Sequence, residues 1–249
     1  MDIAAYLHRI NYRGPLNRDG ETLRQLHLAH LRSVPFENLS IHAGQPIVLN
    51  DDALFDKIVT RKRGGFCYEL NGLFSALLRA LGFQVDRLSA QVANAETEFS
   101  SDFDHMTLLV TLAERWLVDV GFGESFIEPL RLDKADPQVQ DGRAYRIETA
   151  DDYLLGLQLN DENVWKPFYR FKLQAYDYQD FEERCRFHQT SPESHFTKNR
   201  ICSMLTMNGR VSIADTRLIV TESGERNEQP ISSSEQYETL LRKHFGIAM

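Results

Sequence analysis

Hydrophobic residues recur at helical spacing in the first third of the chain. Between residues 21 and 32, leucines lie on or near one stripe, and Val34-Pro35 ends this predicted helix because the residue before a proline avoids helical geometry. A second helix is predicted over residues 51–59. The clearest helix begins at Cys67 and ends before Gly82. Its apolar residues repeat with the helical period at Leu70, Leu73, Phe74, Leu77, Leu78 and Leu81.

After Gly82 the pattern changes to short runs rich in β-branched and apolar residues, as in strands. The predicted strands are 85–92, 105–112, 115–122, 144–149, 153–159 and 165–173. An Asn208-Gly209 pair between two further strand-like runs predicts a hairpin. A closing helix is predicted with Ser232 as its N-cap, Glu235 at its third position and Gly246 after its end. Helices followed by strands favour an α+β fold over a doubly wound parallel sheet.

Charge and cysteine content narrow the class of protein. The net charge of -8 disfavours a general nucleic-acid surface. The first residues lack the pattern of a signal peptide, and no apolar run approaches the ~18 residues that span a bilayer. Three cysteines without a C-x-x-C pair indicate free thiols in a reducing cytosol and no metal site. We therefore expect a cytoplasmic protein without a nucleic-acid or membrane partner.

Cys67 is the candidate nucleophile. It follows Arg63-Gly64-Gly65-Phe66 and opens the buried helix, where backbone N–H groups are unpaired and the helix dipole is positive. Both effects predict a lowered pKa for the thiol. The alternative for this position is a buried, inert cysteine.

His105 is the candidate base, because it begins a predicted strand beside Asp102 and Asp104. His27 and His30 have a metal-like spacing but no evident third ligand. Five histidines are interpreted as surface residues of helices or loops: His8, His27, His30, His42 and His244.

Asp119 is the candidate residue that orients the histidine, as in other triads. It lies between two valines, where an acidic side chain is costly to bury unless it is paired. A two-residue loop after strand 105–112 would place Asp119 on the face opposite His105. A three-residue loop pairs His105 with Gly121 and Thr107 with Asp119, so that His105 and Asp119 share one face. We therefore predict an odd-length loop or a bulge.

At this point the residues resemble a known family, the arylamine N-acetyltransferases. The resemblance rests on several motifs in the family's order, covers residues 6–196 and is loose over the last fifty residues. The motifs are VPFENL at 34–39, RGGFCYE at 63–69 with Asn71, HM at 105–106, WLVDVGFG at 116–123 with PLRL at 129–132, and the weaker TSPESHF at 190–196.

The resemblance implies a papain-like core in three parts. Residues 1–84 form a helical bundle that carries the nucleophile, 85–188 a β-barrel that carries the histidine and aspartate, and 189–249 an α/β lid. It further implies that acetyl-CoA acetylates Cys67, which passes the acetyl group to an aromatic amine, hydrazine or N-hydroxyarylamine in a ping-pong reaction. No metal or prosthetic group is implied.

Some site residues are implied only by this resemblance. Phe36 and Phe122 match positions beside the acceptor pocket, although plain core packing also explains Phe36. Gly121 and Gly123 would let CoA approach the backbone. The sequence departs from the family at Glu128, which puts an acidic group near the presumed path of CoA.

Three other interpretations remain open. A cysteine hydrolase or transglutaminase-like enzyme uses the same order of Cys, His and Asp, because an acyl-enzyme can react with water or with an amine. A macrolactam amide synthase would act on a carrier-bound polyketide. A non-catalytic binding module would keep the fold without a reactive thiol.

Overall fold

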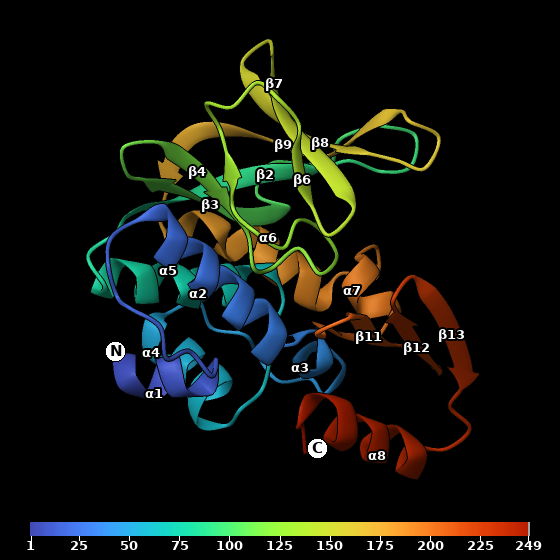
Figure 1. Ribbon diagram of the computed structural model, residues 1–249. Coiled ribbons are helices and arrows are strands. Elements are labelled where there is room, and N and C mark those ends of the chain that lie inside the picture. The colour runs from blue at the N-terminus through green and yellow to red at the C-terminus, as the bar shows by residue number, and fades with distance from the viewer. Residues whose placement is uncertain (249) are drawn as a thin grey trace.

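The computed structural model describes residues 1–248 as three packed parts (Figure 1). Helices lie below a strongly curved antiparallel sheet, and a smaller sheet with the last helix lies beside them. The predicted α+β class is confirmed.

The helical part is built around α5 (Cys67–Ala80), whose residues Leu70, Leu73 and Leu77 are completely buried. The predicted period and the end before Gly82 (φ +87°) are confirmed. The helix predicted over 51–59 is present, but its second half is a π-helical turn. The remaining elements are α1 (Ile3–Arg9), α2 (Gly20–Ser33), α3 (Leu39–His42), α4 (Asp51–Phe55) and the π-helical turn η1 (Asp56–Thr60).

The buried face of α2 corrects a sequence prediction. Leu23, Leu26, His27 and His30 are completely buried, whereas Leu28 and Leu31 are only half-buried. The buried residues follow the spacing i, i+3, i+4, i+7 of a single helix face. Interpreting His27 and His30 as surface residues was therefore wrong, because their places on the helix put them in the core.

The large sheet is a nearly closed antiparallel barrel. Its order is β5-β4-β3-β2-β9-β8-β7-β6, and β5 touches β7 across the gap. The Gln138 side chain helps to close this gap, because it accepts from Arg131 N (2.8 Å) and donates to Arg131 O (3.0 Å). The strands are β2 (Gln84–Val92), β3 (His105–Thr111), β4 (Arg115–Val118), β5 (Leu130–Arg131), β6 (Gln138–Gln140), β7 (Arg143–Ala150), β8 (Tyr153–Leu159) and β9 (Trp165–Tyr176).

The β3–β4 hairpin has the predicted three-residue loop, since Thr111 pairs with Arg115 and Leu108 with Val118. The ladder ends at that last pair, so the strand predicted over 115–122 is too long. The backbone leaves the sheet after Val118 because Val120 N donates to the Asn71 side chain on α5 (2.9 Å).

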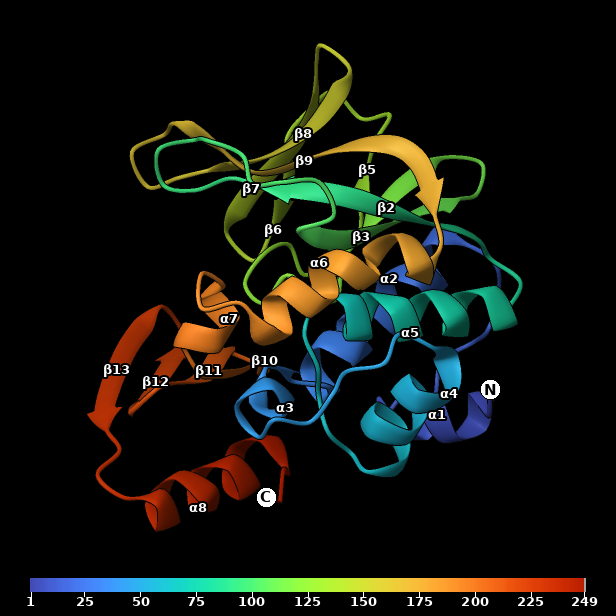
Figure 2. The same cartoon turned by 180° about the vertical axis from the view of Figure 1, so that it is seen from behind.

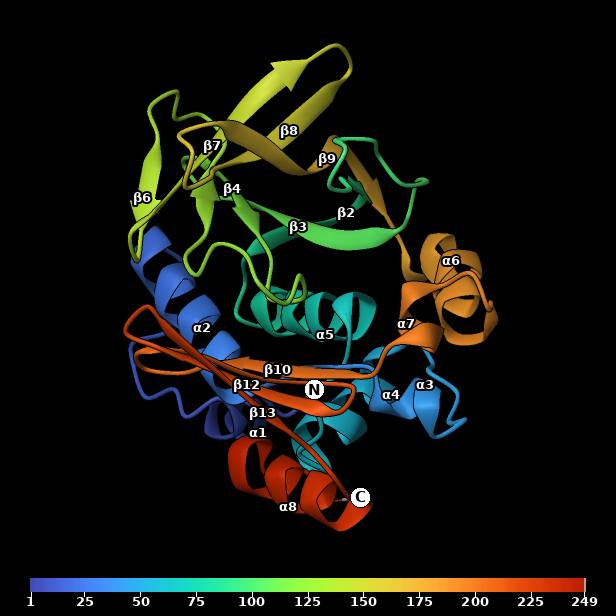
Figure 3. The same cartoon turned by 90° about the vertical axis from the view of Figure 1, so that its right-hand side faces the viewer.

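The smaller sheet has the order β1-β10-β11-β12-β13, so β1 (Phe36–Glu37) ties the C-terminal strands to the helical part. The predicted hairpin at Asn208-Gly209 joins β10 to β11. Figure 2 shows α6 on the far side of the molecule, and Figure 3 shows that it lies beside α5 and the barrel. The other elements are β10 (Ile201–Leu205), β11 (Gly209–Ala214), β12 (Arg217–Glu222), β13 (Glu225–Pro230), α6 (Tyr178–Thr190) and α7 (His195–Lys198).

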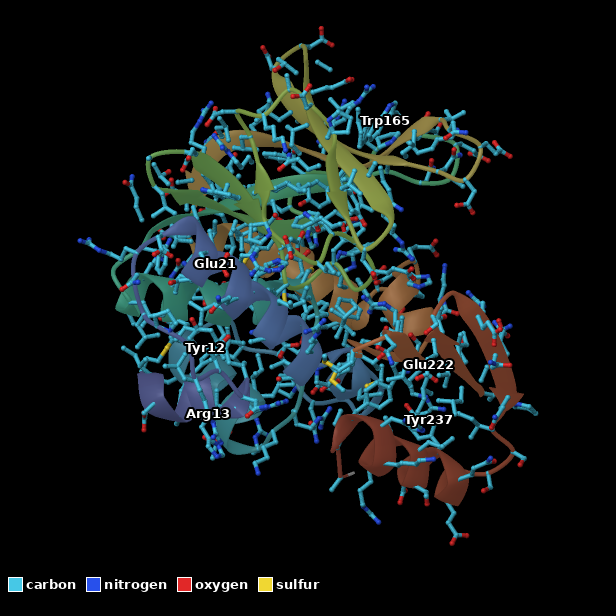
Figure 4. The ribbon with its side chains drawn as sticks, in the orientation of Figure 1. Tyr12, Arg13, Glu21, Trp165, Glu222 and Tyr237 are labelled. Atoms are coloured by element: carbon cyan, nitrogen blue, oxygen red, sulfur yellow. The ribbon has the colours of Figure 1, made fainter. Side chains whose placement is uncertain are left out.

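The last helix, α8 (Ser234–Phe245), ends at the predicted Gly246. Its N-cap is Ser233, which accepts from Gln236 N, and not the predicted Ser232, whose backbone N–H donates to the Gln236 side chain. Tyr237, labelled in Figure 4, packs in a separate small core under β11 and β12.

We expect Leu77→Ala to lower the free energy of unfolding by about 2–5 kcal/mol, because it opens a cavity in the completely buried face of α5. Leu173→Ala is the matched control: this side chain is 43% exposed on β9, so its loss should change stability by about 0.5 kcal/mol or less. Urea titration followed by circular dichroism measures both. Equal losses would contradict the assignment of α5 as the central core helix.

Candidate active site

The segment before Cys67 is fixed by close packing. A Cβ on Gly64 would lie 2.0 Å from the carbonyl oxygen of Pro35, and one on Gly65 would lie 2.7 Å from Cβ of Glu69. No side chain larger than hydrogen fits at either position without movement. These glycines let residues 63–66 lie directly against the neighbouring chain and bring Cys67 to the start of α5.

Two buried ion pairs hold the same segment. Glu69 accepts from Lys57 Nζ (2.7 Å) and from the backbone N–H of Phe66 (3.2 Å), so it fastens the first turn of α5. Arg63 pairs with Glu37 at 2.9 Å, and Glu37 also accepts from Leu39 N. Both pairs are largely shielded from water, so removal of one partner would leave an uncompensated charge.

Cys67 is a buried free thiol, like Cys185 and Cys202. Burial raises the pKa of the Cys67 thiol well above its ordinary value, and the nearby Met106 backbone opposes this with a smaller effect. The lowered pKa predicted from the helix start is therefore wrong for this enclosed site. An isolated thiolate is disfavoured here, so formation of the nucleophile requires a base that takes the proton.

His105 and Asp119 form a short, buried contact. His105 Nε2 lies 2.6 Å from Asp119 Oδ2, and the two side chains are 4% and 0% exposed. The predicted shared face is confirmed. His105 is the first residue of β3, while Asp119 follows the last residue of β4, so the three-residue loop of this hairpin brings them together.

Three donors surround the Asp119 carboxylate. Besides His105, Asn71 Nδ2 donates to Oδ1 (2.8 Å) and Gly121 N donates to Oδ1 (2.9 Å). Burial acts to raise the pKa of Asp119, but the charge and hydrogen bond of His105 with the other two donors lower it overall. The carboxylate is therefore ionised at neutral pH and accepts hydrogen bonds only.

The first turn of α5 lies against this network. A Cβ on Gly121 would lie 2.8 Å from Cα of Cys67, and Asn71, one turn after Cys67, donates to Met106 O (2.6 Å). Figure 3 shows α5 directly below β3. The structure thus brings Cys67, His105 and Asp119 to one place. The close approach of α5 also explains why residue 121 is a glycine. The contact of Gly121 with CoA stays a prediction.

Aromatic rings enclose the histidine. Phe122 meets His105 edge-on, with ring centroids 5.1 Å apart, and Tyr169 lies 5.4 Å from it on another side. Phe36 lies 3.9 Å from the Cβ position of Gly123. A small cavity of about 10 Å³ adjoins these groups. It is lined by Leu31, Asp119, Phe122, Gly123, Ser125, Phe126 and Arg210.

Glu128, which departs from the family pattern, is paired. Its carboxylate accepts from Arg24 Nη1 at 2.9 Å, and Arg24 also bonds Glu21. The positive charge of Arg24 therefore compensates the negative charge of Glu128 near the site.

Sequence reasoning missed three residues of the site. Asn71 was part of the motif, but no sequence pattern linked it to Asp119, which lies 48 positions further along the chain. His27 contacts the Asp119 backbone, and the helix spacing described above was a signal for it. Tyr169 lies on a strand far along the chain, where no sequence signal pointed to the site.

Neither a membrane span nor a metal cluster is found in residues 1–248. No helix there combines the length and the apolar character needed to cross a membrane. No group of three or more His, Cys, Asp or Glu residues in the same range is placed to hold a metal ion.

Comparison with known proteins gives three close similarities. The chain is 36% identical to an arylamine N-acetyltransferase of Mycolicibacterium smegmatis, with 99% of this chain and 92% of that protein covered. It superposes on the Mycobacterium marinum arylamine N-acetyltransferase in complex with CoA with a TM-score of 0.91, 31% identity and coverage of 99% and 93%. A Bacillus cereus arylamine N-acetyltransferase, described as having a unique Cys-His-Glu catalytic triad, gives a TM-score of 0.92 at 26% identity and full coverage of both chains (100% each).

The sequence model of a protein family described as N-acetyltransferase also matches residues 19–249. The fold and these similarities define an acyltransferase. The chain belongs to the arylamine N-acetyltransferase family.

We expect His105→Gln to shift the alkylation of Cys67 by iodoacetamide to alkaline pH, above the ordinary thiol pKa of about 8.5. Without the imidazole the proton has no base to accept it, and burial keeps the thiol protonated at neutral pH. Mass spectrometry of the Cys67 peptide as a function of pH measures the shift, and Cys67→Ser gives the background from the other two thiols. Identical profiles for wild type and His105→Gln would contradict a role of His105 as base.

Proposed function

We propose that this protein transfers an acetyl group from acetyl-CoA to the nitrogen of an arylamine, a hydrazine or an N-hydroxyarylamine, with Cys67 as the intermediate carrier. The observation that carries the proposal is the 2.6 Å contact of His105 with Asp119 beside the buried thiol that opens α5. Family membership and a CoA-bound relative support the donor.

In the first half-reaction, the thiol proton passes to His105 as the sulfur attacks the thioester carbonyl. Because Nε2 faces Asp119, Nδ1 is the nitrogen left to accept that proton. The bond between the acetyl carbon and the CoA sulfur breaks, a bond to the Cys67 sulfur forms, and CoA leaves as a thiol with the proton from the imidazolium.

In the second half-reaction, the amine nitrogen attacks the acetyl-Cys67 thioester and loses a proton to His105. The carbon–sulfur bond breaks, and the sulfur of Cys67 recovers the proton. The ionised Asp119 fixes the imidazole ring and stabilises the imidazolium in both halves. A backbone N–H at Cys67 or His105 would stabilise the oxyanion.

The acceptor would lie against Phe122 and Phe36. Flat aromatic side chains favour an aryl group, because offset and edge-on ring pairs add to the apolar contact. The adjoining cavity of about 10 Å³ is far smaller than the roughly 300–1,000 Å³ of common ligand sites. Entry of an acceptor would therefore require movement of lining side chains. CoA would approach along Gly121 and Gly123.

The third residue of the triad would be Asp119 in this protein, whereas the Bacillus cereus relative is described with a glutamate. The shorter aspartate suits its position, because it follows the end of β4 and reaches His105 while its second oxygen accepts from Asn71 and Gly121.

We expect wild-type protein mixed with acetyl-CoA to gain the mass of one acetyl group on Cys67, and Cys67→Ser to gain none. Intact-mass spectrometry with peptide mapping measures this. An intact protein that is not labelled contradicts acetyl transfer. Labelling that decays at the same rate with and without amine indicates a hydrolase instead.

Acceptor choice is tested with a panel of arylamines and hydrazines, in which CoA release is followed as each amine is added. We expect Cys67→Ser to lose turnover by at least about a thousandfold, since removal of the nucleophile leaves only binding effects. Turnover with aliphatic amines alone would contradict the proposed aryl acceptor.

A further inference from the structure

His27 is a buried titratable residue that the proposed chemistry does not use. It projects from the middle of α2, which runs from the side of β4, where Glu21 is labelled in Figure 4, towards the smaller sheet. The ring is completely buried. It stacks on Phe126 with centroids 6.0 Å apart and an interplanar angle of 10°, and it meets Phe74 edge-on at 6.3 Å.

Both ring nitrogens of His27 contact the backbone of one segment, residues 119–127. Nδ1 lies 2.9 Å from the carbonyl oxygen of Ile127. Nε2 lies 3.0 Å from the carbonyl oxygen and 3.3 Å from the backbone nitrogen of Asp119. One imidazole thus bridges the two ends of the segment that carries Asp119 and Phe122.

The neutral ring bonds the Asp119 backbone in either tautomer. Burial lowers the pKa of His27, while the two carbonyl groups and the carboxylates of Asp119 and Glu128 oppose this with smaller effects. A neutral imidazole has one N–H. If Nδ1 carries it, Nδ1 donates to Ile127 O and Nε2 accepts from Asp119 N. If Nε2 carries it, Nε2 donates to Asp119 O.

We propose that His27 is a positioning residue for acetyl transfer, which holds the Asp119 backbone so that the carboxylate stays in contact with His105. The inference rests on the proposed function of the site. Asp119 has left the β-ladder, which ends at Val118, so its backbone has no strand partner to fix it. Asp119 N donates to His27, and the next backbone N–H, that of Val120, donates to Asn71. These bonds replace the missing strand partner, so α2 and α5 together align the triad.

His30 provides a matched control within the same helix. It is as completely buried as His27 and also packs edge-on against Phe74, at 5.2 Å. Its hydrogen bond, however, goes to the Tyr6 hydroxyl (3.0 Å) and not to the segment with Asp119. Substitution of His30 therefore removes a buried imidazole from the same core without loosening the catalytic carboxylate.

The experiment compares His27→Phe, His27→Gln and His30→Phe below the unfolding temperature of each. We expect His27→Phe to lower kcat about 10–100-fold, as small displacements of catalytic groups do, with KM for acetyl-CoA unchanged within about twofold. His27→Gln should retain most activity, because its amide offers one donor and one acceptor. His30→Phe should keep kcat within about twofold of wild type, even if it lowers the stability of the fold.

A second readout does not depend on acetyl-CoA. A displaced Asp119 stabilises the His105 imidazolium less, so the proton of Cys67 is harder to remove. The pH profile of Cys67 alkylation by iodoacetamide should therefore move to higher pH in His27→Phe and stay at its wild-type position in His30→Phe. If wild type fails to take up acetyl while these profiles differ as expected, the proposed function fails and the positioning role stands.

Two results would overturn the inference: equal kcat losses in His27→Phe and His30→Phe, or wild-type kcat and alkylation profile in His27→Phe. If His27→Phe does not fold, His27→Asn replaces it, because the shorter amide cannot reach both ends of the segment. A loss in His27→Asn with activity retained in His27→Gln supports the inference, and equal rates for the two overturn it.

Discussion

The buried carboxylate of Asp119 is the group on which the rest of the site depends. An ionised side chain without access to water is tolerated only when several donors surround it. His105, Asn71 and the Gly121 backbone supply them here, from β3, α5 and the segment after β4. Satisfying this one charge requires the barrel and the helices to dock in a single relative position.

The same requirement explains the local sequence around Cys67. The helix can approach the Asp119 segment only because Gly121 has no side chain, and its first turn holds its place through the Lys57–Glu69 pair. Cys67 gains an enclosed position beside the His105–Asp119 pair. Enclosure also raises the pKa of its thiol, so in the proposed reaction its reactivity depends on this pair and not on the helix end alone.

Features encoded by local pattern were predicted well. The period of α5 predicted its bounds, and the need for His105 and Asp119 to share one face predicted the odd-length loop of the β3–β4 hairpin. The end of β4 could not be predicted, because its cause is a hydrogen bond from Val120 N to Asn71, far away in the sequence. His27 was misassigned because a histidine was counted as polar, although its helix position was that of a core residue.

The two-residue strand β1 has a consequence for how the molecule unfolds. Phe36 and Glu37 pair with β10, and neighbouring Asn38 donates to the carbonyl groups of Phe196 and Asn199. The C-terminal part is thus hydrogen-bonded to residues 36–38. The same segment packs against the glycines that precede Cys67. Loss of the C-terminal part would remove pairing from the backbone that holds Cys67 in place. The small sheet is therefore expected to unfold together with the site as one cooperative unit, rather than to open as an independent flap.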